Sequence, residues 1–399
     1  MISLIEEEKR KTKTKEKNQN DVKKREKIWD IAKGVGIISI VIGHTTPISN
    51  LHEFVYTYHL VIFYFVTIYF YNEKKYGDKP FVYVGNKIKS TWSKYFFYTV
   101  ILVLMHNLFL KFNMYSHESI KPFEMNSILI GILNSMVFKC SEKFGGALWF
   151  VPTLIFASGL FGGVVYWSRK ISSRFITIEE EKRKYIKYSV IILLSIFLGY
   201  IGVYLNENKL MLSYYIHTSF LIIPICTLGY FLHEYIANFK KFNKLYISIS
   251  TTIVSGIFLY IIVTNGMTIE LSKQEIINGY MFYIVSFIGL IFCISLASII
   301  EKIPMLKDAI SLCGMQSFSI MALHFACIKS IDVIYSKIIH ETNPEIISKW
   351  VTAYPEKLWI IYVIVGCTVP VIFGLLVEKI KTNFMKKSMI GEENGKQRN

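Results

Sequence analysis

Three histidines lie inside long apolar segments of the chain: His44, His59 and His324. A polar side chain within a membrane-spanning segment is costly to bury, so it is a candidate for a functional role. At neutral pH an imidazole can take a proton from a hydroxyl, and a carboxylate or a second histidine can orient it. These residue types therefore indicate proton abstraction or proton-coupled transport.

A lysine shares a helical face with the first of these histidines. Lys33 and His44 are eleven residues apart, which places them about 20° from the same face and about 16 Å apart along an α-helix. Asp30 lies one turn before Lys33 and can pair with it. One stripe of this helix is thus expected to carry an ion pair near one end and an imidazole near the other.

The other two histidines are expected to lie at the depth of His44. A short turn at 47–50 joins the segments that hold His44 and His59, so antiparallel helices would bring both imidazoles to a similar level. A structural hydrogen bond between helices is the alternative for His59. Ser317 lies seven residues before His324 and shares its helical face. We expect the three imidazoles to form one catalytic group.

Three positions are candidates for substrate contact: Glu53, Trp149 and Ser317. Glu53 is one of the two acidic residues near the histidines, the other being Asp332. Trp149 begins an apolar segment on the same expected side of the membrane, where an aromatic-belt residue is the structural alternative.

The composition indicates that these residues belong to a membrane protein. Of 399 residues 52% are hydrophobic and 19% are charged, and the mean hydropathy is +0.39. These values exclude an ordinary soluble enzyme and a disordered chain. Because backbone groups in a bilayer must bond within their own segment, the apolar stretches are expected to be helices, which predicts an all-α polytopic protein. Ten stretches qualify: 28–49, 51–71, 95–111, 147–168, 188–206, 212–233, 246–264, 278–300, 309–331 and 357–377. The apolar stretch 126–138 is too short to span and is expected to be interfacial or re-entrant.

The basic residues indicate the topology. The tail at 1–27, the tail at 378–399 and every second loop together hold 34 Lys or Arg, and the alternate loops hold 9. The positive-inside rule then places both termini in the cytoplasm. The expected organisation is a polar basic tail (1–27), a ten-helix domain (28–377) and a second basic tail (378–399). A net charge of +16 spread over alternate loops does not form a nucleic-acid surface. No spacing of His, Cys, Asp or Glu marks a zinc site, so no metal is expected.

Four short motifs occur in order along the chain. The first places ten residues between a basic residue and a histidine, within an Arg, Asp, Lys-Gly-x-Gly-Ile, Gly-His pattern. The second is a histidine followed by phenylalanines, the third is Leu-Trp-Phe-Val-Pro, and the fourth is Gly-x-x-Ser with a later histidine. The residues are Arg25, Asp30, Lys33, Gly34, Gly36, Ile37, Gly43 and His44; His59, Phe63 and Phe65; Leu148 to Pro152; and Gly314, Ser317 and His324.

In this order the motifs resemble the acyltransferase type 3 family of bacterial integral membrane acyltransferases, which includes fucose 4-O-acetylase-like and intercellular-adhesin-type members. The resemblance runs from residue 25 to about residue 377. The chain departs from the family pattern in the second motif, where Leu60 and Val61 replace Met-Pro and Ile68 replaces a usual glycine.

The resemblance implies O-acyl transfer, usually of acetyl, at the bacterial plasma membrane. The donor would be cytoplasmic acyl-CoA, and the acceptor a sugar hydroxyl of a surface polysaccharide or its lipid-linked precursor. His44 would be the catalytic base or would handle the acyl group. Lys33, Asp30 and Arg25 would bind the acetyl-CoA donor. The expected partners are therefore acyl-CoA, a surface carbohydrate and the lipid bilayer.

Two other classes of protein stay open at this point. An exporter of polysaccharide or small solutes could use the histidines as a proton relay. A non-catalytic partner in an envelope complex would use them only for packing. Transporters often contain an internal repeat, and the first and second five segments show no convincing similarity, which favours the enzyme.

Overall fold

The computed structural model describes residues 27–115, 120–175, 177–236, 244–276, 278–347, 349 and 351–396. Within these ranges ten helices are long and apolar enough to cross a membrane, as expected, and the chain is a multi-pass membrane protein. The spanning helices are Lys27–Thr45, α2 (Ser49–Tyr56) with α3 (Val61–Tyr69), α5 (Pro80–Lys111), η1 (Lys143–Trp149) with α7 (Phe150–Ser172), α8 (Glu180–Glu207), η2 (Ser213–Tyr215) with α9 (Ile216–Ile236), α10 (Leu245–Thr264), α11 (Gly279–Ile300), α13 (Ser317–Ile338) and α15 (Pro355–Lys396).

Short elements connect these helices: α4 (Glu73–Tyr76), α6 (Met125–Met136), β1 (Ile269–Glu270), η4 (Leu271–Lys273), β2 (Glu275–Ile276), α12 (Pro304–Met315) and α14 (Pro344–Ile347). The two strands form a small antiparallel hairpin in which Ile269 faces Ile276. The prediction of an all-helical protein is therefore confirmed. The one addition among the described residues is a hairpin of two strands with two residues each.

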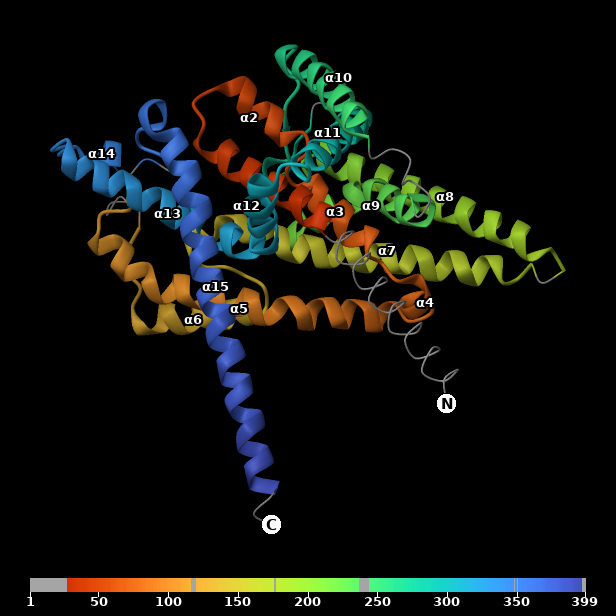
Figure 1. Cartoon of the computed structure of the whole chain (residues 1–399), viewed down its shortest axis with the longest axis horizontal. Coiled ribbons are helices and arrows are strands. Elements are labelled where there is room, and N and C mark those ends of the chain that lie inside the picture. Colours follow the sequence, from red (N-terminus) through yellow and green to blue (C-terminus); the bar gives the residue numbers. More distant parts are fainter. Residues whose placement is uncertain are drawn as a thin grey trace, which may run out of the picture.

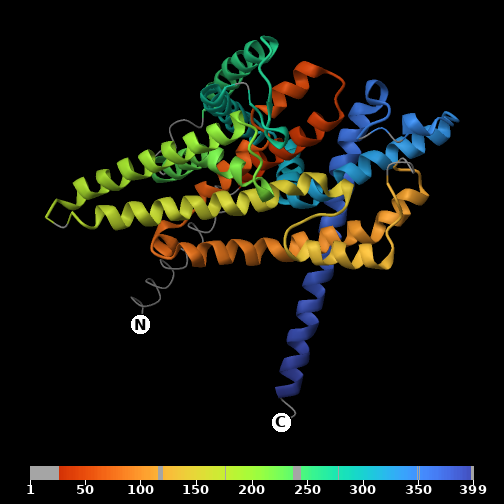
Figure 2. The same cartoon turned by 180° about the vertical axis from the view of Figure 1, so that it is seen from behind.

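The helices form a bundle in which several helices pack in pairs. α8 packs on α9, α10 on α11, and α13 on α15. α5, α7 and α8 run roughly side by side, whereas α15 crosses the bundle and projects from it toward the C-terminus (Figures 1 and 2). The predicted C-terminal tail at 378–399 thus continues α15 as helix to Lys396.

Several predicted boundaries were wrong. The third span was expected at 95–111, but α5 begins at Pro80. The prediction started too late because Lys87 and Lys89 lower the hydropathy of 80–94 without breaking the helix. The segment expected at 309–331 is divided between α12 and α13, and the break falls at Gln316.

The second span is interrupted, although its sequence is continuously apolar. α2 ends at Tyr56 and α3 begins at Val61, so His59 lies in the turn between them. The Thr57 hydroxyl donates to the carbonyl of Phe54 at 2.7 Å, and His59 Nδ1 lies 3.0 Å from the carbonyl of Val55. The backbone N–H groups of Thr57 and His59 donate to the same two carbonyls, so backbone and side chains together satisfy the end of α2 and make the break tolerable inside a membrane. The halves also have different neighbours, since α2 contacts α10 and β1 whereas α3 contacts α9 and α7.

The apolar stretch after α5 folds back against the bundle. α6 lies beside α5 in both views (Figures 1 and 2). The indole Nε1 of Trp92 donates to the carbonyl of Met136 at 2.9 Å. Because Trp92 lies well inside α5, the end of α6 reaches the middle of a spanning helix, which is the arrangement of a re-entrant segment.

Two glycines let the first helix approach α12 closely. A Cβ atom at Gly34 would lie 2.0 Å from the carbonyl oxygen of Ile310, and one at Gly314 would lie 1.8 Å from that of Asp30. Both glycines belong to the motifs of the sequence. Their role in this structure is to bring the backbone that carries Asp30 and Lys33 against α12.

An ion cluster ties four elements at the opposite end of the bundle from the hairpin. Glu73 accepts hydrogen bonds from Arg169 at 3.0 Å, Lys187 at 2.9 Å and the hydroxyl of Tyr230. Burial alone raises the pKa of the Glu73 carboxyl, but the bonds from Tyr230, Lys187 and Arg169 outweigh it and hold that pKa below its ordinary value. The cluster, which we call the Glu73 clamp, joins α4 to α7, α8 and α9.

Candidate active site

Two of the three predicted histidines meet directly. The rings of His44, from the end of the first helix, and His324, from α13, stack with centroids 5.5 Å apart and planes 23° from parallel. Phe325 lies against both, 4.8 Å from the His44 ring and 4.1 Å from the His324 ring. Residues 280 positions apart in sequence thus form one pair, in which His324 is fully buried and His44 is partly buried.

The hydrogen bonds of His324 fix which nitrogen can act as a base. Its Nδ1 lies 2.9 Å from the carbonyl oxygen of Ile320 and 3.1 Å from that of Met321. A carbonyl can only accept, so Nδ1 carries the proton and Nε2 keeps its lone pair. His324 is fully buried, and its Nε2 has no partner among the described residues. The same argument at His59, whose Nδ1 donates to Val55, also leaves Nε2 as the basic nitrogen.

Tyr56 connects the third histidine to this pair. Its ring lies 4.3 Å from that of His59 and 6.4 Å from that of His44. On its other side His52 stacks at 4.1 Å. His52 and Tyr56 are one turn apart on α2, and His59 lies in the turn that follows it, so the three form a row of rings from the partly exposed His52 to the buried His59.

The hairpin between α10 and α11 borders the outer side of this row. β1 packs against α2. In this strand Ile269 is buried and Glu270 is partly buried. Glu53 is 3.1 Å from Nδ1 of His52. The predicted contact residue Glu53 therefore lies beside the ring row, where polar groups of an acceptor could be held.

The other end of the first helix holds the predicted ion pair. Lys33 Nζ lies 2.6 Å from Asp30, and both side chains remain partly exposed. Between this pair and His44 the same stripe carries Ile37 and Val41, which are buried. The stripe exists as expected, but packed side chains fill its middle. Arg25, the third expected donor contact, lies outside the described residues.

The remaining predicted contacts lie farther from the histidine pair. Trp149 ends η1, and its ring contacts that of Tyr215, with centroids 4.7 Å apart and planes tilted by 40°. Its segment reaches the site through Gly146, where a Cβ atom would meet the ring of Phe325 at 3.8 Å. Ser317 is the first residue of α13, two turns before His324, and no ring or hydrogen bond joins it to the histidines within the described part of the chain.

Sequence reasoning missed the aromatic residues of the site and one polar network. Tyr56 and Phe325 are two of 29 Phe and 26 Tyr residues with no distinguishing spacing, although Phe325 directly follows His324 and Tyr56 precedes His59 by three. In the first turn of α13 the buried serine is Ser319, which bonds the hydroxyl of Tyr98 at 2.6 Å and the side chain of Gln316 at 3.1 Å.

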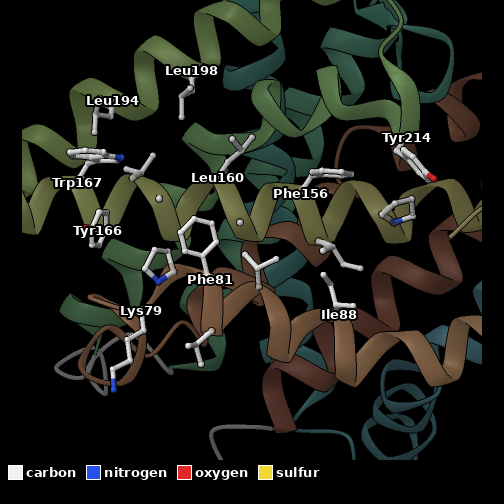
Figure 3. A pocket seen from close by; sticks show the side chains of 18 of the residues that line it. Lys79, Phe81, Ile88, Phe156, Leu160, Tyr166, Trp167, Leu194, Leu198 and Tyr214 are labelled. Atoms are coloured by element: carbon white, nitrogen blue, oxygen red, sulfur yellow. The ribbon is translucent and has the colours of Figure 1, made fainter. Parts of the chain in front are cut away.

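A large cavity lies away from these residues. It has a volume of about 1270 Å³ and is bounded by the first part of α5, by α7 and by α8. Figure 3 shows its apolar lining, with Phe81 and Ile88 on one side and Leu194 and Leu198 on the other. None of the three histidines lines it. Among the described residues no group of three His, Cys, Asp or Glu side chains could hold a metal ion.

The comparisons with known proteins agree with the motif reading. The model of the acyltransferase domain family matches residues 26–379. No curated protein and no solved structure matches the chain. Because the family model covers most of the chain, and the match includes the first helix, the histidine pair and all ten spanning helices, the protein belongs to the acyltransferase 3 family and is a membrane-bound acyl-transfer enzyme.

Proposed function

We propose that this enzyme moves an acyl group, acetyl in the first place, from cytoplasmic acyl-CoA to a hydroxyl of a surface carbohydrate. Its place is the bacterial plasma membrane, with both termini in the cytoplasm. The observation that carries the proposal is the pair of the partly buried His44 and the fully buried His324, in which Nε2 of His324 has no partner within the described part of the chain. Such a pair suits a reaction that must remove a proton from a hydroxyl away from bulk water.

In this proposal His44 is the base. It takes the proton from the acceptor hydroxyl, and the oxygen attacks the thioester carbonyl of the donor. The new carbon–oxygen bond forms as the carbon–sulfur bond breaks, and the CoA sulfur leaves as a thiolate. The thiolate then takes the proton from His44, so that atoms and charge balance. We assign His324 to the stabilisation of protonated His44 through its free Nε2.

The two ends of the first helix divide the binding of the substrates. Asp30 and Lys33 form the donor end, where the ammonium can meet the phosphates of CoA. The ring row of His52, Tyr56 and His59, with Glu53 beside it, forms the acceptor end. Aromatic faces and carboxylates are the groups that hold the apolar faces and hydroxyls of sugars.

The test is direct transfer of label. Membranes containing the protein are incubated with acetyl-CoA labelled in the acetyl group and a panel of surface polysaccharides, and label in the polysaccharide is measured. Membranes without the protein and membranes with His44→Gln serve as controls. We expect transfer that depends on His44. Export of unmodified polysaccharide driven by a proton gradient, with no transfer to any acceptor, would instead identify a transporter.

A further inference from the structure

A buried carboxylate at the start of η1 takes no part in the reaction proposed above. Glu142 is the N-cap of η1, and its side chain accepts a hydrogen bond from the backbone N–H of Phe144 at 3.2 Å. The same oxygen accepts from the hydroxyl of Tyr115. Its other oxygen lies 2.5 Å from Nδ1 of His106, which is also buried. One carboxylate thus binds groups from α5, from the loop after α5 and from η1.

The hydrogen bonds of His106 identify it as the cationic partner of Glu142. Its Nε2 lies 3.0 Å from the carbonyl oxygen of Lys121. Because a carboxylate and a carbonyl can only accept, both ring nitrogens carry protons, and the ring is an imidazolium. The face of the ring stacks on that of Phe123, with centroids 3.5 Å apart and planes 10° from parallel. The pair therefore fastens α5 and residues 121–123 to the start of η1.

η1 is a helix that its own hydrogen bonds hold weakly. It is a 3₁₀ helix of seven residues, whereas such helices seldom exceed three or four residues because their hydrogen-bond geometry is poor. Two of the seven are glycines, Gly145 and Gly146, which are the most flexible residues of a chain. A Cβ atom at Gly145 would lie 2.2 Å from Sγ of Cys140, so a stiffer residue does not fit there. The conformation of η1 thus depends on groups outside it.

η1 forms one wall of the histidine site. It packs against α13, and a Cβ atom at Gly146 would meet the ring of Phe325 at 3.8 Å. The ring of Phe325 lies 4.8 Å from that of His44 and 4.1 Å from that of His324. A shift of η1 would therefore move Phe325 and change how the two imidazoles are held.

We propose that Glu142 and His106 are positioning residues for acyl transfer. Their pair, with the hydroxyl of Tyr115, fixes the first turn of η1, and η1 holds Phe325 against the two imidazoles. The effect passes through η1 and not through contact with the reacting groups. This inference rests on the proposed function, because it takes the histidine pair as the place of the reaction. Misplacement of a reacting group by about 1 Å can lower a rate by about 100-fold, so such support matters for catalysis.

Three variants change the hydrogen bonds of Glu142. Glu142→Ala removes all three bonds of its side chain. Tyr115→Phe removes one of them and keeps the ring, which stacks on Phe144 with centroids 4.4 Å apart. Glu142→Gln is the conservative variant. Its amide oxygen can accept from Tyr115 and Phe144, and its amide nitrogen can donate to Nδ1 of a neutral His106.

Asn107→Ala is the matched control. Asn107 follows His106 on α5, and its side chain holds the backbone of Phe123 by two hydrogen bonds, of 2.7 and 2.9 Å. Its loss loosens the same loop but removes no bond of Glu142. It therefore separates a general loosening of the loop from a loss of support for η1.

The first measurement does not depend on acyl transfer. The full-length protein with isotope-labelled histidine is studied in phosphatidylcholine bilayers by solid-state NMR, and the signals of His44 and His324 are assigned with His44→Gln and His324→Gln. The ring of Phe325 shifts these signals according to its position. We expect both signals to shift in the two variants that lose hydrogen bonds, and to keep their wild-type positions in the conservative variant and the control.

The second measurement is transfer of acetyl from acetyl-CoA to whichever polysaccharide of the panel accepts label. In Glu142→Ala we expect kcat per folded protein to fall by up to about 100-fold. The KM for acetyl-CoA should not change, because we place the donor at Asp30 and Lys33, at the other end of the first helix. Glu142→Gln and Asn107→Ala should keep kcat within about twofold of the wild type.

The spectra decide this inference separately from the proposed function. Unchanged signals of His44 and His324 in folded Glu142→Ala would overturn it. If that variant does not fold, unchanged signals in Tyr115→Phe would have the same meaning. Equal shifts in Asn107→Ala would also overturn it, because loosening of the loop would then explain them. Absence of transfer to every polysaccharide would instead refute the proposed function, and the spectra would still test the support of η1.

Discussion

His324 shows how a helix can prepare a side chain for chemistry. An imidazole that gives its Nδ1 proton to carbonyls of its own helix is fixed in one tautomer and one orientation. Nε2, the second nitrogen, then has a lone pair and can accept a hydrogen bond or a proton. His59 is fixed in the same way by Val55, whereas the contacts of the His44 ring are with the rings of Tyr56, His324 and Phe325.

The role of His44 is tested by removing its basicity while keeping its polarity. A general base contributes about 10²- to 10⁴-fold to the rate, so we expect His44→Gln and His44→Ala to lose transfer to this extent. Glutamine keeps a hydrogen-bonding amide but takes up no proton at neutral pH. Acetate on the polysaccharide is measured in cells with matched membrane levels, and His340→Asn, at an exposed position, serves as the control. Near-normal acetylation with His44→Gln would contradict a role in proton transfer.

Lys33 is tested through the donor. We expect Lys33→Ala to raise the KM for acyl-CoA, because the ammonium that meets the CoA phosphates is removed and Asp30 is left unpaired. Lys33→Arg should keep most of the affinity, although the planar guanidinium fits a phosphate differently. Lys27 lies at the start of the same helix as Lys33 and pairs with Asp308 of α12 at 2.7 Å, so Lys27→Ala is the matched control. An unchanged KM in Lys33→Ala would show that the ion pair does not bind the donor and only holds the end of the helix in place.

Among the individual residues of the site, the sequence identifies the types that are rare in membrane-spanning segments and misses the types that are common there. His44, Lys33 and Asp30 stand out because charged and titratable groups are costly in an apolar segment. Tyr56 and Phe325 complete the site, but tyrosine and phenylalanine occur throughout this chain. Only their contacts, which depend on three separate helices, distinguish them.

The elements show where hydropathy stops being informative. An apolar run predicts that a segment crosses the membrane, but it does not show whether the helix is continuous. The break at 57–60 arises because α2 and α3 pack on different neighbours and because Thr57 and His59 satisfy the end of α2. Both causes lie in tertiary structure and in side-chain geometry.

The close contact between the first helix and α12 predicts a strict requirement for glycine. Gly34→Ala would place a methyl group 2.0 Å from the carbonyl oxygen of Ile310, which forces the two helices apart. Such overpacking costs about 1–3 kcal/mol, and backbone atoms relieve it poorly. We expect a lower thermal unfolding midpoint in detergent for Gly34→Ala. Gly163→Ala, in open surroundings, should leave the midpoint unchanged or raise it slightly, and equal midpoints for the two variants would rule out this account.

The Glu73 clamp predicts a dependence of stability on pH. The pKa of Glu73 is lower in the folded protein than in the unfolded chain, so its contribution is fully present above the unfolded pKa and is lost as the pH falls through the folded pKa. We expect Glu73→Gln to lower the unfolding midpoint at about pH 7 and to weaken its fall toward about pH 4. Glu179 makes an exposed ion pair with Lys182 at 3.4 Å, so Glu179→Gln should change little. The idea fails if both variants follow the wild-type curve.

The whole molecule has a topology that the distribution of charge predicts and labelling can check. The loop between α7 and α8 is expected in the cytoplasm and the loop between α8 and α9 outside. In a background without native cysteines, we expect an impermeant thiol reagent added to intact cells to label Asn208→Cys and not Ser173→Cys, both at helix ends. Labelling of Ser173→Cys before lysis would invert the arrangement.

The number of spans could be predicted because each depends only on its own residues. The assembly of the site could not, because His44 and His324 meet only after most of the bundle has formed. Matching depth on separate helices predicts that two side chains can meet. Which faces turn toward one another depends on contacts such as that of Gly34 with Ile310, which single-sequence patterns do not contain.

The local pairing of Asp30 with Lys33 has a consequence for biogenesis. Gly34 and its partner Gly314 are 280 positions apart, which at ribosomal rates of 5–20 residues per second means a delay of about 15 to 60 s. During that interval the first helix leaves the translocon without the helix that will cover it. An isolated charge would then face lipid, whereas Lys33 already has its counter-ion one turn away on the same nascent helix. The pair that we assign to donor binding therefore also allows the helix that carries His44 to insert into the bilayer before its partner helix is made.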